Sequence, residues 1–231
     1  GFTVVAVGTS LPELAVAIEA IGNDSPDIAI GGVLGSNVAN VMLVLGTAAV
    51  LGAKSEGGED VKRDAMAVIV ATIFMTIFVF RGDVPLVGGV VMLSCLLAYY
   101  YYTYTRAIAG DDEYEFEDSW LPRNMSVAIP ACIIGGATIW LGAKLLVDGS
   151  TSIAETFGVS EAVIGLTIVA LGTSLPELAV TVVAGLRGQG GVAVGNVLGS
   201  NVMNIMGIVG IASIFGGGID VDSEFTRDIM V

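Results

Sequence analysis

An internal repeat constrains this sequence more than any other feature. Adding 164 to a residue number aligns the two halves without a gap, and Thr3–Gly46 matches Thr167–Gly210 at 24 of 44 positions. The same register continues further along the chain, where Arg63-Asp64 corresponds to Arg227-Asp228. Random apolar sequence would not hold one register across two loops. We therefore interpret the two segments as copies of one structural unit.

The composition indicates that both copies lie in a lipid bilayer. The chain is 54% hydrophobic and 14% charged, whereas soluble domains carry about 25% charged residues. Its apolar residues form runs close to the roughly 20 residues that a helix needs to cross a membrane. An eighth helix is expected to begin near residue 226. The seven spans expected before it are 1–20, 28–51, 65–80, 85–105, 126–147, 160–186 and 191–215.

The order of these spans predicts that the two copies are inverted. From the first copy of the motif helix to the second, the chain makes five more crossings, the last of which is the second copy itself, and an odd number reverses the direction through the membrane. We predict an all-α polytopic membrane protein with an inverted-topology repeat on a plan of five plus five helices. This chain would lack the first helix and about the last two. The first repeat would be 1–105, an acidic cytoplasmic linker 106–125, and the second repeat 126–231.

The ionisable residues exclude several classes of function. A net charge of −14 disfavours nucleic acid as a partner, because that would require a basic patch. The chain has no histidine, which excludes His-based zinc ligation and His-based catalysis. We predict no enzyme activity and no cofactor. Basic residues in the 52–64 linker place that linker in the cytoplasm. The acidic run Asp111–Asp118 is expected on the same side as a solvated linker, since its spacing does not fit an EF-hand.

Each repeat carries the motif Gly-Thr-Ser-Leu-Pro-Glu-Leu, at Gly8–Leu14 and Gly172–Leu178. Its proline has no N–H, and its ring pushes against the carbonyl four residues earlier, so the helix breaks there. Within hydrocarbon, a broken helix is tolerated only inside protein or beside a cavity. We therefore predict Pro-broken helices at the membrane midplane, where a bound cation is one possible partner for the freed carbonyls.

Glu13 and Glu177 are the acids of the two motifs, and acids within a membrane are functional as a rule. Two facing carboxylates would repel each other or bind protons. One calcium ion offsets both charges, and so do sodium ions, so binding of either cation excludes the other. Neighbouring hydroxyls, carboxamides and carbonyls complete an all-oxygen set suited to hard cations. The alternatives are protonated structural acids, and serines and asparagines that only hydrogen-bond between helices.

The doubled motif, followed in each half by Gly-Ser-Asn, resembles the α-repeats of the calcium/cation antiporter superfamily, and most closely prokaryotic sodium/calcium exchangers. The resemblance implies alternating access, with Ca²⁺ and Na⁺ bound as substrates. It implies that Glu13 and Glu177 bind calcium, helped by the backbone carbonyls of Thr9 and Thr173. The sodium sites would also use the positions of Ala6, Ser10, Ser36, Ala170, Ser174 and Ser200, with Asn40 and Asn204 at the central position.

Two residues depart from that pattern. Asn204 stands where such exchangers often carry Asp, which removes a titratable group, and Gly32 replaces the asparagine found at the matching Asn196. The predicted function is Na⁺-driven Ca²⁺ antiport across the cell (inner) membrane. The alternatives are H⁺- or K⁺-coupled antiport, and a cation channel in which the glutamates form a selectivity filter. The oligomeric state stays open.

Overall fold

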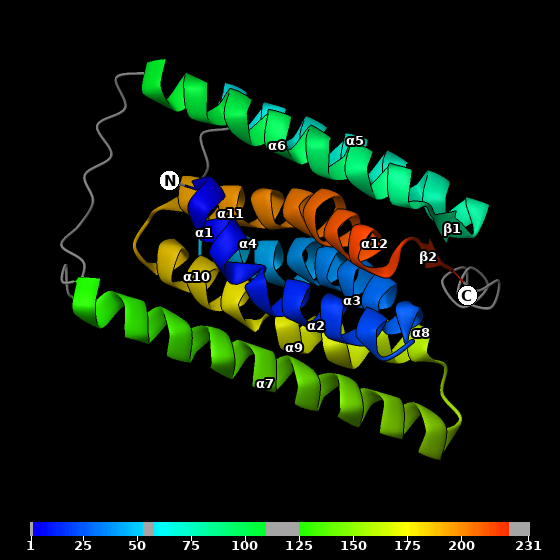
Figure 1. The fold of residues 1–231 in the computed structure, drawn as a ribbon. Helices are drawn as coiled ribbons and strands as arrows, with labels where there is room; N and C mark the ends of the chain where they lie inside the picture. The colour runs from blue at the N-terminus through cyan, green and yellow to red at the C-terminus, as the bar shows by residue number, and fades with distance from the viewer. Residues whose placement is uncertain (1, 53–57, 110–124, 222–231) are drawn as a thin grey trace.

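The protein is described by a computed structural model over residues 2–52, 58–109 and 125–221, which are almost entirely helical (Figure 1). Two short strands, β1 (Asp83–Val84) and β2 (Ile219–Asp220), form an antiparallel pair. The helices and their π-helical segments (η) are α1 (Phe2–Thr9), α2 (Leu11–Gly22), α3 (Pro26–Ala39), η1 (Asn40–Val44), α4 (Leu45–Val50), α5 (Glu59–Arg81), α6 (Leu86–Ala109), α7 (Met125–Phe157), α8 (Glu161–Ile164), η2 (Gly165–Val169), α9 (Ala170–Thr173), α10 (Leu175–Leu186), α11 (Gly190–Val202), η3 (Met203–Val209) and α12 (Gly210–Gly216).

These elements form seven helical spans close to the expected ones. Four stretches within the described residues are long and apolar enough to cross a membrane, and the bent run from α8 to α10 would be a fifth. The helix expected near residue 226 and most of the 106–125 linker lie outside the described residues. The four stretches are Pro26–Val50, Glu59–Arg81, Leu86–Arg106 and Gly190–Gly216.

Helix α5 begins six residues earlier than the apolar run predicts. Its first turns are charged, and two ion pairs at i, i+3 spacing stabilise them: Lys62 with Glu59 at 3.3 Å and Arg63 with Asp60 at 2.6 Å. Pairs of this spacing lie on one helix face. Charged residues can therefore extend a membrane helix beyond the segment that hydropathy marks.

The two halves are inverted and interlocked. Helices α1 and α2 run through the centre of the molecule in the direction opposite to α8, α9 and α10 (Figure 1). Helix α3 packs on α8, η2 and α9 of the second half, and α1 packs on α11. Helices α5 and α6 cover α11, η3 and α12, and α7 covers α2. The inverted-topology prediction is therefore confirmed.

Small residues allow the central helices to approach closely. A Cβ added at Gly35 would overlap the carbonyl oxygen of Leu166 and lie 2.6 Å from the Cβ of Ala170. A Cβ at Gly165 would lie 2.9 Å from the carbonyl oxygen of Ile28. Membrane helices pack through such small residues because lipid gives little hydrophobic drive for their association.

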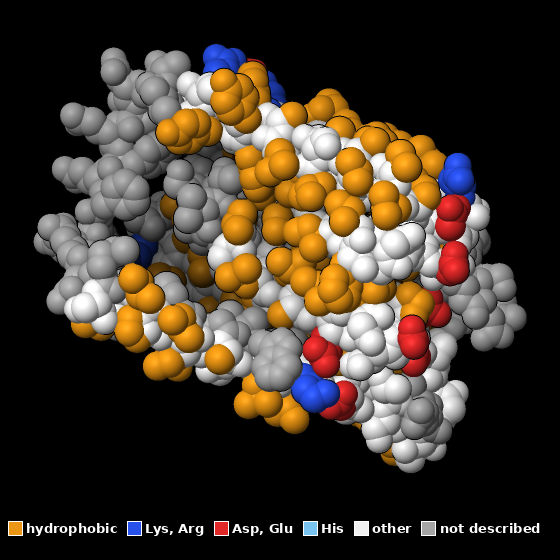
Figure 2. Space-filling model, in the orientation of Figure 1, with side chains coloured by type: hydrophobic (Ala, Val, Ile, Leu, Met, Phe, Trp, Pro, Cys, Tyr) orange, Lys and Arg blue, Asp and Glu red, His pale blue; other side chains and the backbone are white. Residues whose placement is uncertain are grey.

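The outer surface is apolar. Figure 2 shows hydrophobic side chains across the visible face, with charged groups gathered toward its edges. Many large apolar side chains are exposed, including Met42, which is 75% exposed, and Phe80. A continuous apolar surface of this kind suits contact with lipid and would be unfavourable in water. The chain is a multi-pass membrane protein.

Candidate cation-binding site

The two motif helices are broken at equivalent serines. Ser10 separates α1 from α2 with φ −84° and ψ 6°, and Ser174 separates α9 from α10 with φ −80° and ψ 1°. Pro12 and Pro176 lie in the first turn of the helix that follows, and the second break bends the chain by 42°. The predicted Pro-broken helices are therefore present, and each break precedes a motif glutamate by three residues.

Glu13 and Glu177 lie in the first turns of α2 and α10 and are buried, with exposures of 3% and 0%. The two motifs meet in the structure, because Ser10, three residues before Glu13, contacts the carboxylate of Glu177. The Oε1 atom of Glu177 accepts a hydrogen bond from Ser10 at 3.4 Å. Among the described residues, the other three carboxylate oxygens have no hydrogen-bond partner. Buried polar atoms without partners are rare and call for an explanation, such as an absent ion.

A set of buried hydroxyls follows the repeat symmetry. The hydroxyl oxygens of Ser36 and Thr173 lie 3.1 Å apart, and those of Ser200 and Thr9, at the equivalent positions, lie 3.3 Å apart. Each pair joins one half of the chain to the other. Both threonine hydroxyls also approach the carbonyl oxygen three residues earlier, that of Ala6 at 3.2 Å and that of Ala170 at 3.3 Å.

Asparagines of the two halves also pair across the symmetry axis. Asn40 donates its Nδ2 to Oδ1 of Asn201 at 3.1 Å, and Asn204 donates its Nδ2 to Oδ1 of Asn37 at 3.1 Å. The Oδ1 atoms of Asn40 and Asn204 are buried and find no partner in the part of the chain that the structure describes. Sequence reasoning singled out Asn40 and Asn204 but missed Asn37 and Asn201. The available signal was the asparagine of each Gly-Ser-Asn motif.

The site is not fully symmetric. Asn196 accepts from the hydroxyl of Thr9 and donates to the backbone carbonyl of Glu177, both at 3.5 Å. Its counterpart Gly32 can make neither contact, and a small cavity lined partly by Gly32 and Glu13 lies there instead. The substitution recognised in the sequence therefore leaves Glu13 less supported by protein groups than Glu177.

All twelve predicted site residues are buried. Hydrogen bonds join most of them to one another, whereas Ser174 Oγ makes no hydrogen bond to any described residue. No group of three or more His, Cys, Asp or Glu side chains comes together in the described ranges. The two glutamates therefore supply the whole formal charge of the site, and the other groups supply neutral oxygens.

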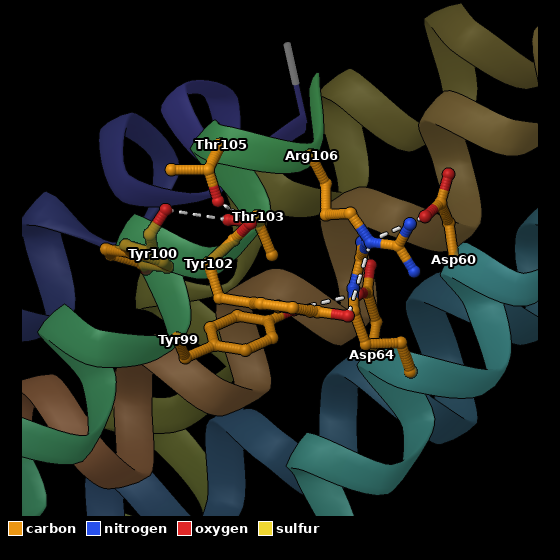
Figure 3. A network of polar contacts seen from close by, with 9 residues as sticks. Asp60, Asp64, Tyr99, Tyr100, Tyr102, Thr103, Thr105 and Arg106 are labelled. Atoms are coloured by element: carbon orange, nitrogen blue, oxygen red, sulfur yellow. Dashed lines mark hydrogen bonds and ion pairs between the residues drawn. The ribbon is translucent and has the colours of Figure 1, made fainter. Parts of the chain in front are cut away.

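A second polar network lies where α5 begins and α6 ends (Figure 3). Asp64 accepts a hydrogen bond from the Tyr99 hydroxyl at 2.8 Å and pairs with Arg63 at 2.7 Å. Arg106 stacks over the ring of Tyr102, 5.8 Å from its centroid. The hydrogen bond from Tyr99 to Asp64 joins α6 to α5, and none of these residues is among the twelve predicted site residues.

Comparison with known proteins gives consistent matches. The family described as sodium/calcium exchanger protein matches residues 1–105 and 127–231. A putative antiporter, CaxA of Alkalimonas amylolytica, is 35% identical over 243 residues, covering 100% of this chain and 74% of that protein. The sodium/calcium exchanger MaX1 of Methanosarcina acetivorans is 32% identical over 253 residues, covering 93% and 72%. A structure of the exchanger NCX_Mj soaked with 2.5 mM Na⁺ and 1 mM Sr²⁺ superposes with a TM-score of 0.67 at 32% identity, covering 98% and 73%.

Proposed function

Because this chain belongs to the sodium/calcium exchanger family, we propose that it exchanges Ca²⁺ for Na⁺ across the cell membrane by alternating access. One observation carries the proposal: three of the four carboxylate oxygens of Glu13 and Glu177 are buried without a partner among the described residues. An unpaired buried carboxylate costs several kcal/mol. A bound cation would remove that cost by supplying both charge and ligand bonds.

The proposed calcium ligands are the two glutamates and the backbone carbonyls of Thr9 and Thr173. These are hard oxygen donors, and calcium binds six to eight of them. The support is that the motif helices break beside these threonines, where Pro12 and Pro176 cannot donate to the carbonyls of Gly8 and Gly172. For sodium, the proposed additional ligand positions are Ala6, Ala170, Ser10, Ser174, Ser36 and Ser200, with Asn40 and Asn204 at the centre.

The charge of this site explains why transport would be an exchange. With both glutamates ionised, the empty site carries two negative charges in a medium of low dielectric constant, where an isolated charge is costly. One calcium ion neutralises both charges, and sodium ions can do the same. A loaded site can therefore change its exposure from one side of the membrane to the other more easily than an empty one. Movement of one cation inward is thereby tied to movement of the other outward.

The test is calcium uptake by proteoliposomes. Vesicles loaded with Na⁺ are diluted into Na⁺-free buffer containing radioactive calcium, and we expect uptake that stops when a sodium ionophore collapses the gradient. Glu177→Gln should abolish this uptake, whereas Glu59→Gln, a change at an exposed surface ion pair, should leave it unchanged. Calcium entry that needs no ion gradient would indicate a channel instead. Full uptake by Glu177→Gln would refute the assigned site.

The residues at the centre of the proposed site, Asn40 and Asn204, argue against coupling to protons. Asn40 and Asn204 are carboxamides, and a carboxamide does not take up a proton near neutral pH. The two glutamates are then the titratable groups of the proposed site. Replacing the internal Na⁺ by K⁺, or by a pH gradient, in the same vesicles separates the three coupling ions. We expect uptake with Na⁺ alone.

A further inference from the structure

Asn37 and Asn201 have no place among the proposed cation ligands, yet each bonds to a central asparagine of the other repeat. Asn204 donates to Asn37, and Asn40 donates to Asn201, both at 3.1 Å. The repeat offset of 164 converts Asn37 into Asn201 and Asn40 into Asn204. The same crossing bond therefore occurs twice with the same length and the same direction.

The direction of the first bond is fixed by a further contact. A carboxamide offers an acceptor on one side and a donor on the other, and a half-turn about its axis exchanges them. Asn37 donates its Nδ2 to the backbone carbonyl of Asn201 at 3.4 Å, and a carbonyl can only accept. Asn37 must then present Oδ1 to Asn204, so Asn204 must present Nδ2 in return.

The direction of these two hydrogen bonds determines where the unpaired Oδ1 atoms of Asn204 and Asn40 lie. With Nδ2 of Asn204 turned toward Asn37, its Oδ1 is directed away from that bond, and it is buried without a partner among the described residues. Asn40, bonded to Asn201, leaves its own Oδ1 in the same condition. A flipped amide would instead present an N–H donor there, and a donor repels a cation. Oxygen ligands are what a small hard cation requires.

We propose that Asn37 and Asn201 are positioning residues that fix the amide orientation of Asn204 and Asn40, so that both central oxygens face a small monovalent cation. This inference rests on the proposed function, because amide orientation matters only if a cation occupies the centre. It adds that the ligand asparagine of each repeat is set by the other repeat. Asn37 should therefore act through Asn204 and not through Asn40, its neighbour on the same chain segment.

A double-mutant cycle on the purified full chain tests this pairing. Equilibrium Na⁺ binding is measured by competition with radioactive calcium for wild type, Asn37→Leu, Asn204→Ala and the double variant. Leucine keeps the side-chain volume and removes the acceptor. We expect Asn37→Leu to weaken Na⁺ binding up to about fivefold, the effect of losing one hydrogen bond between neutral groups. In the Asn204→Ala background the same change should add little further loss.

The matched control cycle combines Asn37→Leu with Asn40→Ala. Here the two losses should multiply, because Asn37 makes its described side-chain bonds to Asn204 and to the Asn201 backbone. If the losses of Na⁺ affinity caused by Asn37→Leu and Asn204→Ala also multiplied in the double variant, the proposal would be overturned. Asn37→Ala serves as a second variant, and failure of both Asn37 variants to give folded protein would also overturn it, since it would show a structural role.

Wild type and Glu177→Gln are measured in parallel to keep the two proposals apart. If Na⁺ displaces calcium from wild type and Glu177→Gln binds neither ion, the proposed function stands whatever the cycles show. If wild type shows no competition between the ions, the proposed function itself fails. A result in which competition is normal and the cycle is multiplicative rejects the positioning role alone.

Discussion

The hydroxyl oxygens of Ser36 and Thr173 lie 3.1 Å apart across the boundary between the two halves of the chain. Ser36 also approaches the carbonyl oxygen of Ala170 at 3.4 Å. Thr173 in turn lines the same small cavity as Glu13. Ser36 of the first repeat therefore contacts Thr173 of the second repeat, and Thr173 lies at the cavity beside Glu13 of the first repeat. Cation ligands proposed for the two halves form one connected network.

We expect Ser36→Ala to affect sodium more than calcium. In the proposed site the Ser36 hydroxyl is a sodium ligand, whereas the calcium ligands are carboxylates and backbone carbonyls. Loss of one neutral ligand should cost about 1 kcal/mol, or roughly fivefold in apparent Na⁺ affinity. The measurement is the Na⁺ concentration that half-displaces calcium, with Ser94→Ala on the exposed face of α6 as control. Equal losses of Na⁺ and Ca²⁺ affinity would contradict the separate ligand sets.

Two glycines of α3 should respond very differently to alanine. A Cβ at Gly35 would meet the backbone of Leu166 and the Cβ of Ala170, neither of which can move without separating α3 from η2 and α9. A Cβ at Gly32 would meet one flexible atom, Cγ1 of Val169, at 3.3 Å. Overpacking typically costs about 1–3 kcal/mol. Thermal melts in detergent should show a clear loss of stability for Gly35→Ala and a small one for Gly32→Ala, and the reverse order would contradict this packing.

The inverted fold could be predicted because the repeat and the number of apolar spans between its two copies can both be read from the sequence. Pro12 and Pro176 likewise mark the helix breaks through a local effect, the loss of an N–H donor. The start of α5 was placed too late, since hydropathy does not register the ion pair of Arg63 with Asp60. The effect of proline on its own helix was therefore predictable from the sequence. The extension of α5 by ion pairs at the membrane boundary was not.

The candidate site was predictable in its residues and not in its connections. Asn37 and Asn40 lie three apart on one chain segment, which suggests that they are neighbours. The structure instead bonds each to the opposite repeat, Asn37 to Asn204 and Asn40 to Asn201. Contacts of this kind depend on how two inverted segments meet, which no periodicity within one segment encodes. The cavity beside Gly32 is unpredictable for the same reason.

Tyr99→Phe should weaken the attachment of α6 to α5 without altering the ion site. The change removes the hydroxyl that donates to Asp64 at 2.8 Å and leaves that buried carboxylate with Arg63. A hydrogen bond to a charged group contributes about 1.5–3 kcal/mol. The melting temperature should therefore fall by several degrees while Na⁺-dependent calcium uptake remains. Tyr104→Phe, at an exposed position on α6, is the control, and equal effects of both changes would contradict the role of the network.

Glu13→Gln should change stability and function in opposite directions. Without ions, both Glu13 oxygens are buried with no partner among the described residues. An amide of the same shape carries no charge and needs no proton, whereas the buried carboxylate must either stay ionised and unpaired, at a cost of several kcal/mol, or take up a proton. In chelator and Na⁺-free buffer the variant should therefore melt several degrees higher than wild type. Its calcium-induced stabilisation should disappear, because the site would retain one negative charge against a divalent ion.

The same melts on Glu19→Gln separate this effect from a general loss of negative charge. Glu19 lies on the same helix as Glu13, but it pairs with Lys144 at 3.6 Å near the surface, where an ion pair contributes at most about 1 kcal/mol. That variant should melt no higher than wild type in chelator and should keep its full calcium-induced shift. A wild-type protein already more stable than Glu13→Gln without ions would mean that protein groups satisfy the Glu13 carboxylate. A cation would then not be needed to explain its burial.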